Sequence, residues 1–326
     1  METLSRLGVV VIGRNEGERL RRCLLSIQAQ ATAIVYVDSG SRDGSVATAT
    51  DLGVMVHELD LARPFTAARA RNAGVQALVA AAADVEHIQF VDGDCEMACN
   101  WLRSAGRFLD HRPDVVAVSG RLRERFPEHS IYNLLCDLEW DTPLGAAKAC
   151  GGIVLVRRAA FQQVGGFLED LIAGEEPELC VRLRANGGVI WRLEDEMAFH
   201  DAAMTRFSQW WRRSMRTGFA YAQGASLHGS PPERHWVRET RSAWIWGLAL
   251  PIFVVGGAIA HPGFLLGFLL YPLQVARIYA RGKGQSKERL VQAFFFVLGK
   301  FSEAAGALKF AASKLIGRRT GLIEYK

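Results

Sequence analysis

Two carboxylates, Asp92 and Asp94, directly follow the apolar run 86–91. That run predicts a buried strand, and open α/β sheets bind their ligands at the carboxyl ends of strands. Oxygen ligands of this kind suit Mg²⁺ or Mn²⁺, which commonly bind the phosphate groups of a substrate. A solvated polar turn after a strand explains the same spacing, so the metal site needs support from other segments.

Asp38 is a third acidic residue at a predicted strand end, and it opens the small-residue stretch Ser39–Ser45. Its carboxylate can accept a hydrogen bond from the ring N–H of uracil or guanine. A Gly/Ser turn in which Ser41 or Asp43 caps the next helix is the alternative.

Glu175, Glu176 and Glu178 surround Pro177 further along the chain. Acids and proline are both favoured in the first turn of a helix, where the helix dipole stabilises negative charge. One acid satisfies that need, and the chain has three. The excess favours a catalytic role for this acidic segment over capping alone.

The first 200 residues alternate strand and helix signals, so the acids fall at the ends of regular elements. The predicted strands cover residues 9–12, 34–37, 54–56, 86–91, 115–119 and 153–156, and the predicted helices cover 18–28, 45–52, 66–83, 101–110, 159–164 and a segment around 179–184. Near-continuous apolar strands that alternate with helices indicate an α/β fold with a mostly parallel, Rossmann-like sheet covered on both faces.

Five segments in this order resemble the family 2 inverting glycosyltransferases. They are Val9–Glu16, Val37–Ser45, Phe90–Asp94, Gly165–Phe167 and Gly174–Leu179. The resemblance covers about residues 7–215. It implies the GT-A fold, a nucleotide-diphosphate sugar donor and a divalent metal cofactor, Mn²⁺ or Mg²⁺.

The resemblance also implies roles by position. Asn15 and Glu16 would line the nucleotide pocket, Asp38 would contact the nucleobase, Arg71 and Asn72 would lie near the ribose and diphosphate, Asp92 would face the ribose or sugar, and Asp94 would bind the metal. Glu176, beside Glu175, stands where the family usually has an aspartate as catalytic base. An inverting transfer needs such a base, because the acceptor hydroxyl loses its proton as it attacks.

Two later residues are further candidates. Related folds often close the metal site with a histidine after the base-bearing helix, which His200 matches, although a lone histidine is often only a satisfied polar residue. Gln209–Arg213 partly resembles the Gln-x-x-Arg-Trp box of processive synthases, and Arg212 could touch the diphosphate. The fifth residue is arginine, which argues against processivity. For Trp210 and Trp211, an amphipathic basic-aromatic helix at the membrane surface is the favoured interpretation.

The segment 242–276 contains no formal charge and exceeds the roughly 20 residues that a transmembrane helix needs. His261–Gly263 interrupts it, which predicts two spans at 242–260 and 264–280. Basic residues before and after the spans predict a hairpin with both ends in the cytoplasm. A buried hairpin of a soluble protein is the alternative. Residues 291–316 predict an interfacial helix, with a further span as the less favoured possibility.

The charge distribution agrees with this organisation. The chain of 326 residues has a formal net charge of +5, and from Arg277 onward eleven Lys/Arg face three Glu. A basic C-terminal part on a neutral-to-acidic body favours binding to an anionic membrane face and not to nucleic acid.

The N-terminal apolar run is too short for a signal peptide, and the six cysteines show no spacing typical of a disulfide framework, so we expect synthesis in a reducing cytosol.

The sequence therefore predicts a catalytic domain at 1–225, a basic linker at 226–241, a transmembrane hairpin at 242–280 and a basic amphipathic tail at 281–326. The predicted function is transfer of one sugar from a nucleotide sugar, a UDP-sugar by preference, to a lipid-linked or glycan acceptor at the cytosolic face of the inner membrane. Three alternatives remain. They are a catalytically silent scaffold, a sugar-phosphate nucleotidyltransferase and, least favoured, a dinucleotide dehydrogenase, which would need G-x-G-x-x-G before its first helix.

Overall fold

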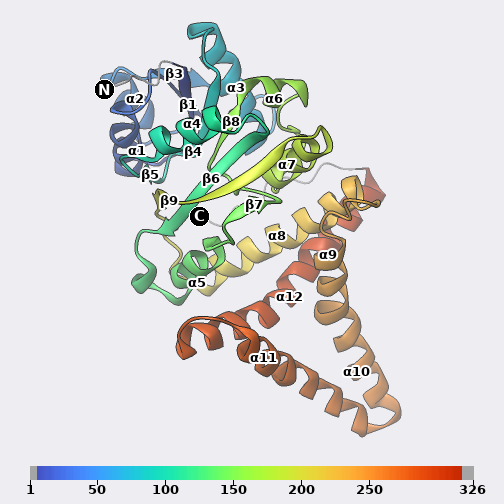
Figure 1. Ribbon diagram of the computed structural model, residues 1–326. Helices are drawn as coiled ribbons and strands as arrows, with labels where there is room; N and C mark the ends of the chain where they lie inside the picture. Colours follow the sequence, from blue (N-terminus) through green and yellow to red (C-terminus); the bar gives the residue numbers. More distant parts are fainter. Residues whose placement is uncertain (1–5, 318–326) are drawn as a thin grey trace. The chain divides into compact units, whose positions relative to one another are not determined.

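The computed structural model describes residues 6–317 (Figure 1). The chain divides into two compact units. The first contains the residues up to Phe126 together with Glu139–Ala202, and the second contains Pro127–Leu138 together with the residues from Ala203 onward. The division passes through helix α5 (Ile131–Trp140).

The first unit is built on a nine-stranded sheet with the order β3-β2-β1-β4-β8-β6-β9-β5, in which β7 also pairs with β9. The strands are β1 (Leu7–Gly13), β2 (Ala33–Asp38), β3 (Met55–Glu58), β4 (His87–Asp92), β5 (Cys95–Met97), β6 (Val115–Glu124), β7 (Gly145–Ala147), β8 (Val154–Arg157) and β9 (Val189–His200). β1 to β4 are mutually parallel, and β6 runs parallel to β9.

The predicted α/β class and mostly parallel sheet are confirmed, with one correction. β8 is an apolar run like its neighbours, yet it pairs antiparallel with both β4 and β6. Its residues Val154–Val156 are almost fully buried. A continuous apolar run reports burial on both faces of a sheet and not the direction of the strand, so the sequence pattern could not distinguish the two.

Helices cover both faces of the sheet, because β1 alternates its side chains between two cores. Val9 and Val11 point into one core, and Val10 and Ile12 into the other. The first core is closed by α1 (Glu18–Gln28), α2 (Ser45–Asp51) and α4 (Trp101–His111), and the second by α3 (Ala67–Ala81), α6 (Arg158–Gln163) and α7 (Glu175–Ala185).

The second unit is helical over its described residues. After the short η1 (Pro127–His129), its helices are α8 (Phe207–His228), α9 (Val237–Trp244), the π-helical turn η2 (Ile245–Ala249), α10 (Leu250–Ala260), the 3₁₀ segment η3 (Pro262–Leu269), α11 (Leu270–Arg281) and α12 (Ser286–Ile316). The α-helix is interrupted at 261–263, as the sequence predicted.

Helix α12, which covers the predicted interfacial segment, packs along α8. Trp210 of α8 lies edge-on to Phe295 of α12, with ring centroids 4.9 Å apart, and is buried instead of lying at a membrane surface. Gly218 of α8 lets the helices approach closely, since a Cβ there would lie 2.1 Å from the carbonyl oxygen of Glu303. Contact with a membrane by α12 stays a prediction.

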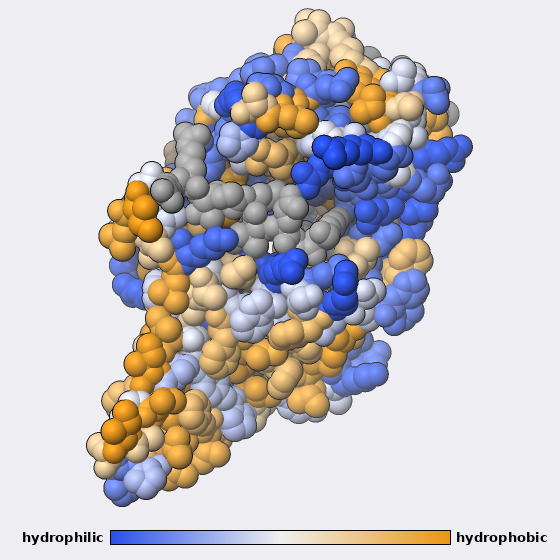
Figure 2. Space-filling model, turned by 180° about the vertical axis from the view of Figure 1, so that it is seen from behind, coloured by the Kyte–Doolittle hydropathy of each residue, from blue (hydrophilic) through white to orange (hydrophobic). Residues whose placement is uncertain are grey.

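Three stretches in the described part of the chain are long and apolar enough to cross a membrane: Val237–Ala260, Pro262–Arg281 and Ser286–Ile316. Half of the most apolar window of the third is buried inside the unit, against 11% and 0% for the first two. The first two instead expose large apolar side chains, visible as the orange surface at the lower left of Figure 2, and these include Ile252, Phe253, Val255, Ile259, Leu266 and Leu273. This pattern suits association with a membrane.

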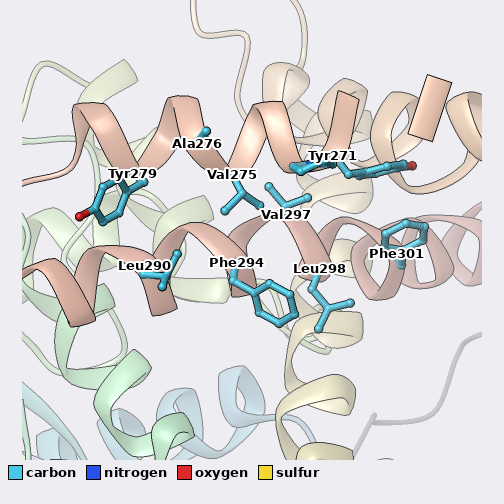
Figure 3. Close-up of a pocket in the computed structure, with 10 residues that line it drawn as sticks. Tyr271, Val275, Ala276, Tyr279, Leu290, Phe294, Val297, Leu298 and Phe301 are labelled. Carbon is cyan, nitrogen blue, oxygen red and sulfur yellow. The ribbon is translucent and has the colours of Figure 1, made fainter. Parts of the chain in front are cut away.

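A cavity of about 560 Å³ separates α11 from α12 (Figure 3). Apolar and aromatic side chains line it, among them Tyr271, Val275 and Ala276 of α11 and Phe294, Val297 and Phe301 of α12. The ring of Tyr271 stacks on Phe301 with centroids 5.4 Å apart. At the other end of the cavity, the Arg289 guanidinium lies over the ring of Tyr279, 4.6 Å from the ring centroid.

Candidate active site

The sheet brings three of the predicted site segments to one edge. In the parallel register, Gly13 at the end of β1 lies beside Asp38 at the end of β2. On the other side of β1, Ile12 pairs with Asp92 at the end of β4. The segments that follow these strand ends contain Asn15 and Asp94, so residues from separate parts of the sequence gather at the carboxyl edge.

Asn15 and Asp38 build the first part of this edge. The backbone N–H of Asn15 donates to Ser41 Oγ at 2.9 Å, and its side-chain carbonyl accepts from the N–H of Arg42 at 2.8 Å. Asp38 accepts from the N–H groups of Gly40 and Ser41 and from the Tyr36 hydroxyl, each at 2.8 Å. These bonds fix the turn after β2. They occupy three of the roughly four acceptor positions of the carboxylate.

Glu16 is the neighbouring predicted nucleotide residue. Its carboxylate forms an ion pair with Arg19 at 2.8 Å, and its side chain is 12% exposed. The aliphatic part of Glu16 lies close to Gly93, between Asp92 and Asp94, since a Cβ built at Gly93 would be 3.3 Å from Glu16 Cγ. Glu16 therefore stands beside the Asp92–Asp94 turn.

Arg71 of α3 links two of the predicted site acids. Its guanidinium binds Asp92 at 2.8 Å and Glu175 at 2.5 Å. Burial opposes the charge of Arg71, but the nearby Asp92 and Glu175 carboxylates outweigh it and raise its pKa. The side chain of Asp92 is 36% exposed while that of Arg71 is 3% exposed, so Asp92 is the member of this network that faces solvent.

Asn72 was predicted to lie near the ribose and diphosphate. In the structure its side chain forms hydrogen bonds with the loop that contains Phe167. Its amide donates to the carbonyl of Phe167 at 2.9 Å and accepts from the N–H of the same residue at 3.0 Å. These reciprocal bonds hold the segment after Gly165–Gly166 against α3. In this arrangement Asn72 positions the loop, and its contact with a donor stays a prediction.

Asp94 and His200 meet although 106 residues separate them. β5 and β9 pair antiparallel with Cys95 opposite His200, which brings His200 Nε2 to 3.3 Å from Asp94 Oδ2. Ligand atoms of Asp94, Cys95 and His200 all lie within 4.8 Å of one another. Two ligands at right angles on an ion such as Mn²⁺ or Mg²⁺ would be about 3 Å apart, so the Asp94–His200 pair fits a divalent cation.

Glu124, at the end of β6, was not predicted from the sequence. Its Oε2 lies 4.0 Å from His200 Nδ1, and its carboxylate accepts from the N–H groups of Phe126 and Ala202. Desolvation raises the pKa of Glu124. A carboxylate on the far side of a metal-binding histidine commonly orients its ring. Only the register between β6 and β9 places Glu124 there, and no local motif signals it.

Glu176, on the first turn of α7, is 2% exposed. Its two oxygens accept from the backbone N–H groups of Cys150 at 2.7 Å and Gly151 at 2.8 Å, and the Cys180 thiol donates to it at 2.8 Å. Desolvation raises its pKa from the ordinary 4.5 to about 7, although these three bonds oppose the rise. A carboxyl with this pKa can exchange a proton near neutrality. The sequence did not predict the two cysteines beside it.

Arg212, the last predicted site residue, lies on α8 in the second unit and is exposed. Its contact with the diphosphate stays a prediction.

Comparison with known proteins supports the architecture. Residues 8–164 match the family described as "Glycosyl transferase family 2", and residues 136–206 match "N-terminal domain of galactosyltransferase". The mannosyltransferase PcManGT from Pyrobaculum calidifontis, solved with GDP-Man and Mn²⁺, aligns with a TM-score of 0.61 at 19% identity, covering 95% of this chain and 88% of that one.

Two curated relatives resemble parts of the chain. The pre-mycofactocin glycosyltransferase of Mycobacterium tuberculosis is 27% identical over 237 residues, which are 68% of this chain and 47% of the relative. A TPR repeat-containing protein of Synechococcus elongatus is 36% identical over 94 residues, 29% of this chain and 22% of the relative. The chain thus spans less than half the length of either relative.

The strand order of the sheet and the similarity to the solved mannosyltransferase show the GT-A fold. Within that fold, the part of the chain from β1 through α6 is similar to the family 2 glycosyl transferases.

Proposed function

We propose that this protein transfers one sugar, with inversion, from a nucleotide-diphosphate sugar to a hydroxyl or phosphate of a lipid-linked or membrane-proximal acceptor. The observation that carries the proposal is the meeting of Asp94 and His200, 3.3 Å apart, on the sheet edge that also holds Asp92. Paired metal ligands at such an edge suit the binding of a diphosphate.

Asp94 and His200 would hold the divalent ion, Mn²⁺ or Mg²⁺. The ion supplies neutralisation of the charge that develops on the leaving nucleoside diphosphate. Glu124 would keep the His200 ring oriented from its other nitrogen. The Mn²⁺ bound with GDP-Man in the structurally similar mannosyltransferase supports this assignment.

The donor's sugar and ribose would lie against Asp92, the exposed acid of the Arg71 network. Asn15 and Glu16 would line the nucleotide pocket, and Asp38, which is 2% exposed, would hold the turn against the base. Uracil is the base we would test first, with guanine as the comparison.

Glu176 would take the proton of the acceptor hydroxyl in a single displacement, which is the step that makes the transfer inverting. Its pKa of about 7 lets it accept that proton near neutrality. Because Glu176 is 2% exposed and bonded to Cys150 and Gly151, the acceptor would have to displace this loop to reach the carboxylate. Glu175 would hold Arg71 in place during the transfer.

The exposed apolar surfaces of 237–260 and 262–281 would sit in a bilayer. Basic residues before 242 and after 276 would place both ends of this hairpin in the cytoplasm, with the catalytic domain in the cytosol. Such an anchor suits an acceptor that is itself a lipid.

The test is sugar transfer by membranes that contain the protein, supplied with radiolabelled UDP- or GDP-sugars and Mn²⁺. Asp94→Ala and Glu176→Gln should each lower the rate by about 100-fold or more, while Asp84→Asn, on an exposed loop, should retain it. Wild-type rates in both site variants would refute the assignment. Binding of nucleotide sugar without transfer or donor hydrolysis by the wild type would favour the silent scaffold.

A further inference from the structure

Two cysteines converge on Glu176 from different elements. Cys150 precedes Gly151 in the loop between β7 and β8, whereas Cys180 lies one helical turn after Glu176 on the same face of α7. The Cys180 thiol is 2.8 Å from Glu176 Oε1. One ligand atom from each of Cys150, Glu176 and Cys180 lies within 4.8 Å of the others, and Glu176 and Cys180 are buried.

We propose that Cys150, Glu176 and Cys180 form an inhibitory site for a thiophilic divalent cation, with Zn²⁺ as the ion of best fit. The inhibition rests on the proposed function, because it requires Glu176 to be the base; the binding of metal does not. Zinc held by two thiolates and one carboxylate would occupy the oxygen that must accept the proton. It would also fasten the Cys150–Gly151 loop to α7, where the acceptor has to enter.

The geometry of the cluster suits zinc. Zinc commonly takes three protein ligands in a tetrahedral arrangement, with the fourth position left for water. Zn–S distances near 2.3 Å and Zn–O distances near 2.1 Å place the ligand atoms about 3.6–3.8 Å apart. In the structure, Cys180 Sγ lies 2.8 Å from Glu176 Oε1, and every pair of ligand atoms in the cluster lies within 4.8 Å. The separation of about 3.6–3.8 Å that zinc requires falls between these two distances. Small side-chain adjustments therefore complete the site.

Ligand chemistry separates this site from the Asp94–His200 pair. Thiolates select Zn²⁺ over Mg²⁺ and Mn²⁺, whereas carboxylate oxygens suit Mg²⁺ and Mn²⁺. The cluster offers two thiols and one oxygen, whereas the group at Asp94 offers one oxygen, one nitrogen and the single thiol of Cys95. The catalytic Mn²⁺ or Mg²⁺ would therefore bind at Asp94 and His200, and the inhibitory Zn²⁺ would bind at the two cysteines.

Binding must release protons, because each thiol has to ionise before it ligates the metal. One Zn²⁺ enters, and two Zn–S bonds and one Zn–O bond form. Two protons pass from the thiols to the buffer, and a third passes from Glu176 wherever its carboxyl is protonated. The hydrogen bond with Cys150 and burial both raise the pKa of the Cys180 thiol. The Glu176 carboxylate, once ionised, supplies the negative charge that faces the incoming cation, whereas the neighbouring Glu175 is paired with Arg71.

The experiment titrates the full-length protein in detergent with Co²⁺, which replaces Zn²⁺ and gives a thiolate-to-metal charge-transfer band. The wild type should show the band. Cys150→Ala and Cys180→Ala should weaken binding by about 100-fold or more, the size of effect that supporting residues of metal sites already reach. Cys99→Ala is the matched control, since Cys99 is an exposed free cysteine.

A parallel assay adds Zn²⁺ to Mn²⁺-supported transfer, with each variant compared with its own zinc-free rate. Zinc should inhibit the wild type and Cys99→Ala but not Cys150→Ala. A missing band, or a band that survives in both cluster variants, would overturn the metal site. A cysteine-dependent band in a protein that transfers no sugar would support the metal site and overturn the proposed function.

Discussion

Burial of Glu176 should make the stability of the first unit depend on pH through this one group. Its pKa is about 7 in the folded chain and 4.5 for an ordinary glutamate. A difference of about 2.5 units corresponds to about 3 kcal/mol in the free energy of unfolding, at 1.36 kcal/mol per unit. Desolvation is the principal cause, so the effect depends on the burial observed in the structure.

The sign follows from proton binding. Between pH 4.5 and 7 the folded chain keeps the proton on Glu176 while the unfolded chain releases it. The folded state then binds more protons than the unfolded state, so the free energy of unfolding falls as pH rises. Below pH 4.5 this contribution is fully present, and above about pH 7 it is lost.

The assay compares thermal unfolding of wild type and Glu176→Gln in detergent from pH 4 to 8.5. The glutamine does not titrate, and its different hydrogen bonds to Cys150 and Gly151 add a constant offset. The variant's free energy of unfolding relative to wild type should therefore rise by about 3 kcal/mol across this range. For a domain of this size that is about 6–12 °C in Tm.

Glu18→Gln is the control for loss of a carboxylate, because the Glu18 side chain is 64% exposed. A Tm difference between Glu176→Gln and wild type that stays constant from pH 4 to 8.5 would refute the reasoning. So would a difference that decreases as pH rises, since that would mean a folded-state pKa below 4.5.

Two further substitutions test the packing that positions the site and the helices. Arg71→Ala should lower the free energy of unfolding by about 3–5 kcal/mol, because it removes the cation and leaves the Glu175 charge uncompensated; Arg63→Ala, in an exposed pair, should cost at most about 1 kcal/mol by the same denaturation measurement. Gly218→Ala should cost about 1–3 kcal/mol, since its methyl group would overlap the α12 backbone, whereas Gly256→Ala, which meets no atom within 4 Å, should be neutral or slightly stabilising. Equal melting temperatures within either pair would contradict the packing described here.

Local elements were the most predictable part of the fold. The helix predicted at 18–28 forms with those bounds as α1, because Leu20, Leu24 and Ile27 recur on one face and are all buried. β5 and β7 were missed, since three residues are too few to show a period. The strand β9 was also missed, because charged residues occupy its exposed middle, around Glu194–Glu196.

The position of a candidate residue at the sheet edge was predictable where the residue ends a strand, as Asp38 and Asp92 do. What could not be predicted is set by register between distant strands. Cys95 pairs with His200, and Glu124 also pairs with His200. Shifting either register by one residue would turn His200 to the opposite face of the sheet. No local pattern reports such a register, so Glu124 had no signal in the sequence.

The environments of the adjacent acids Glu175 and Glu176 give a physical reason to separate their roles. Glu175 lies against the Arg71 guanidinium, a permanent positive charge that favours its ionised form. The hydrogen bonds seen at Glu176 come from two backbone N–H groups and the Cys180 thiol, all uncharged donors, and they do not offset the cost of desolvation. Neighbouring acids with such different surroundings commonly have different functions in a site. One is ionised and pairs with a cation, and the other exchanges a proton. Under the proposed function, these surroundings favour Glu176 over Glu175 as the base, because Glu176 lacks the cation that its neighbour has.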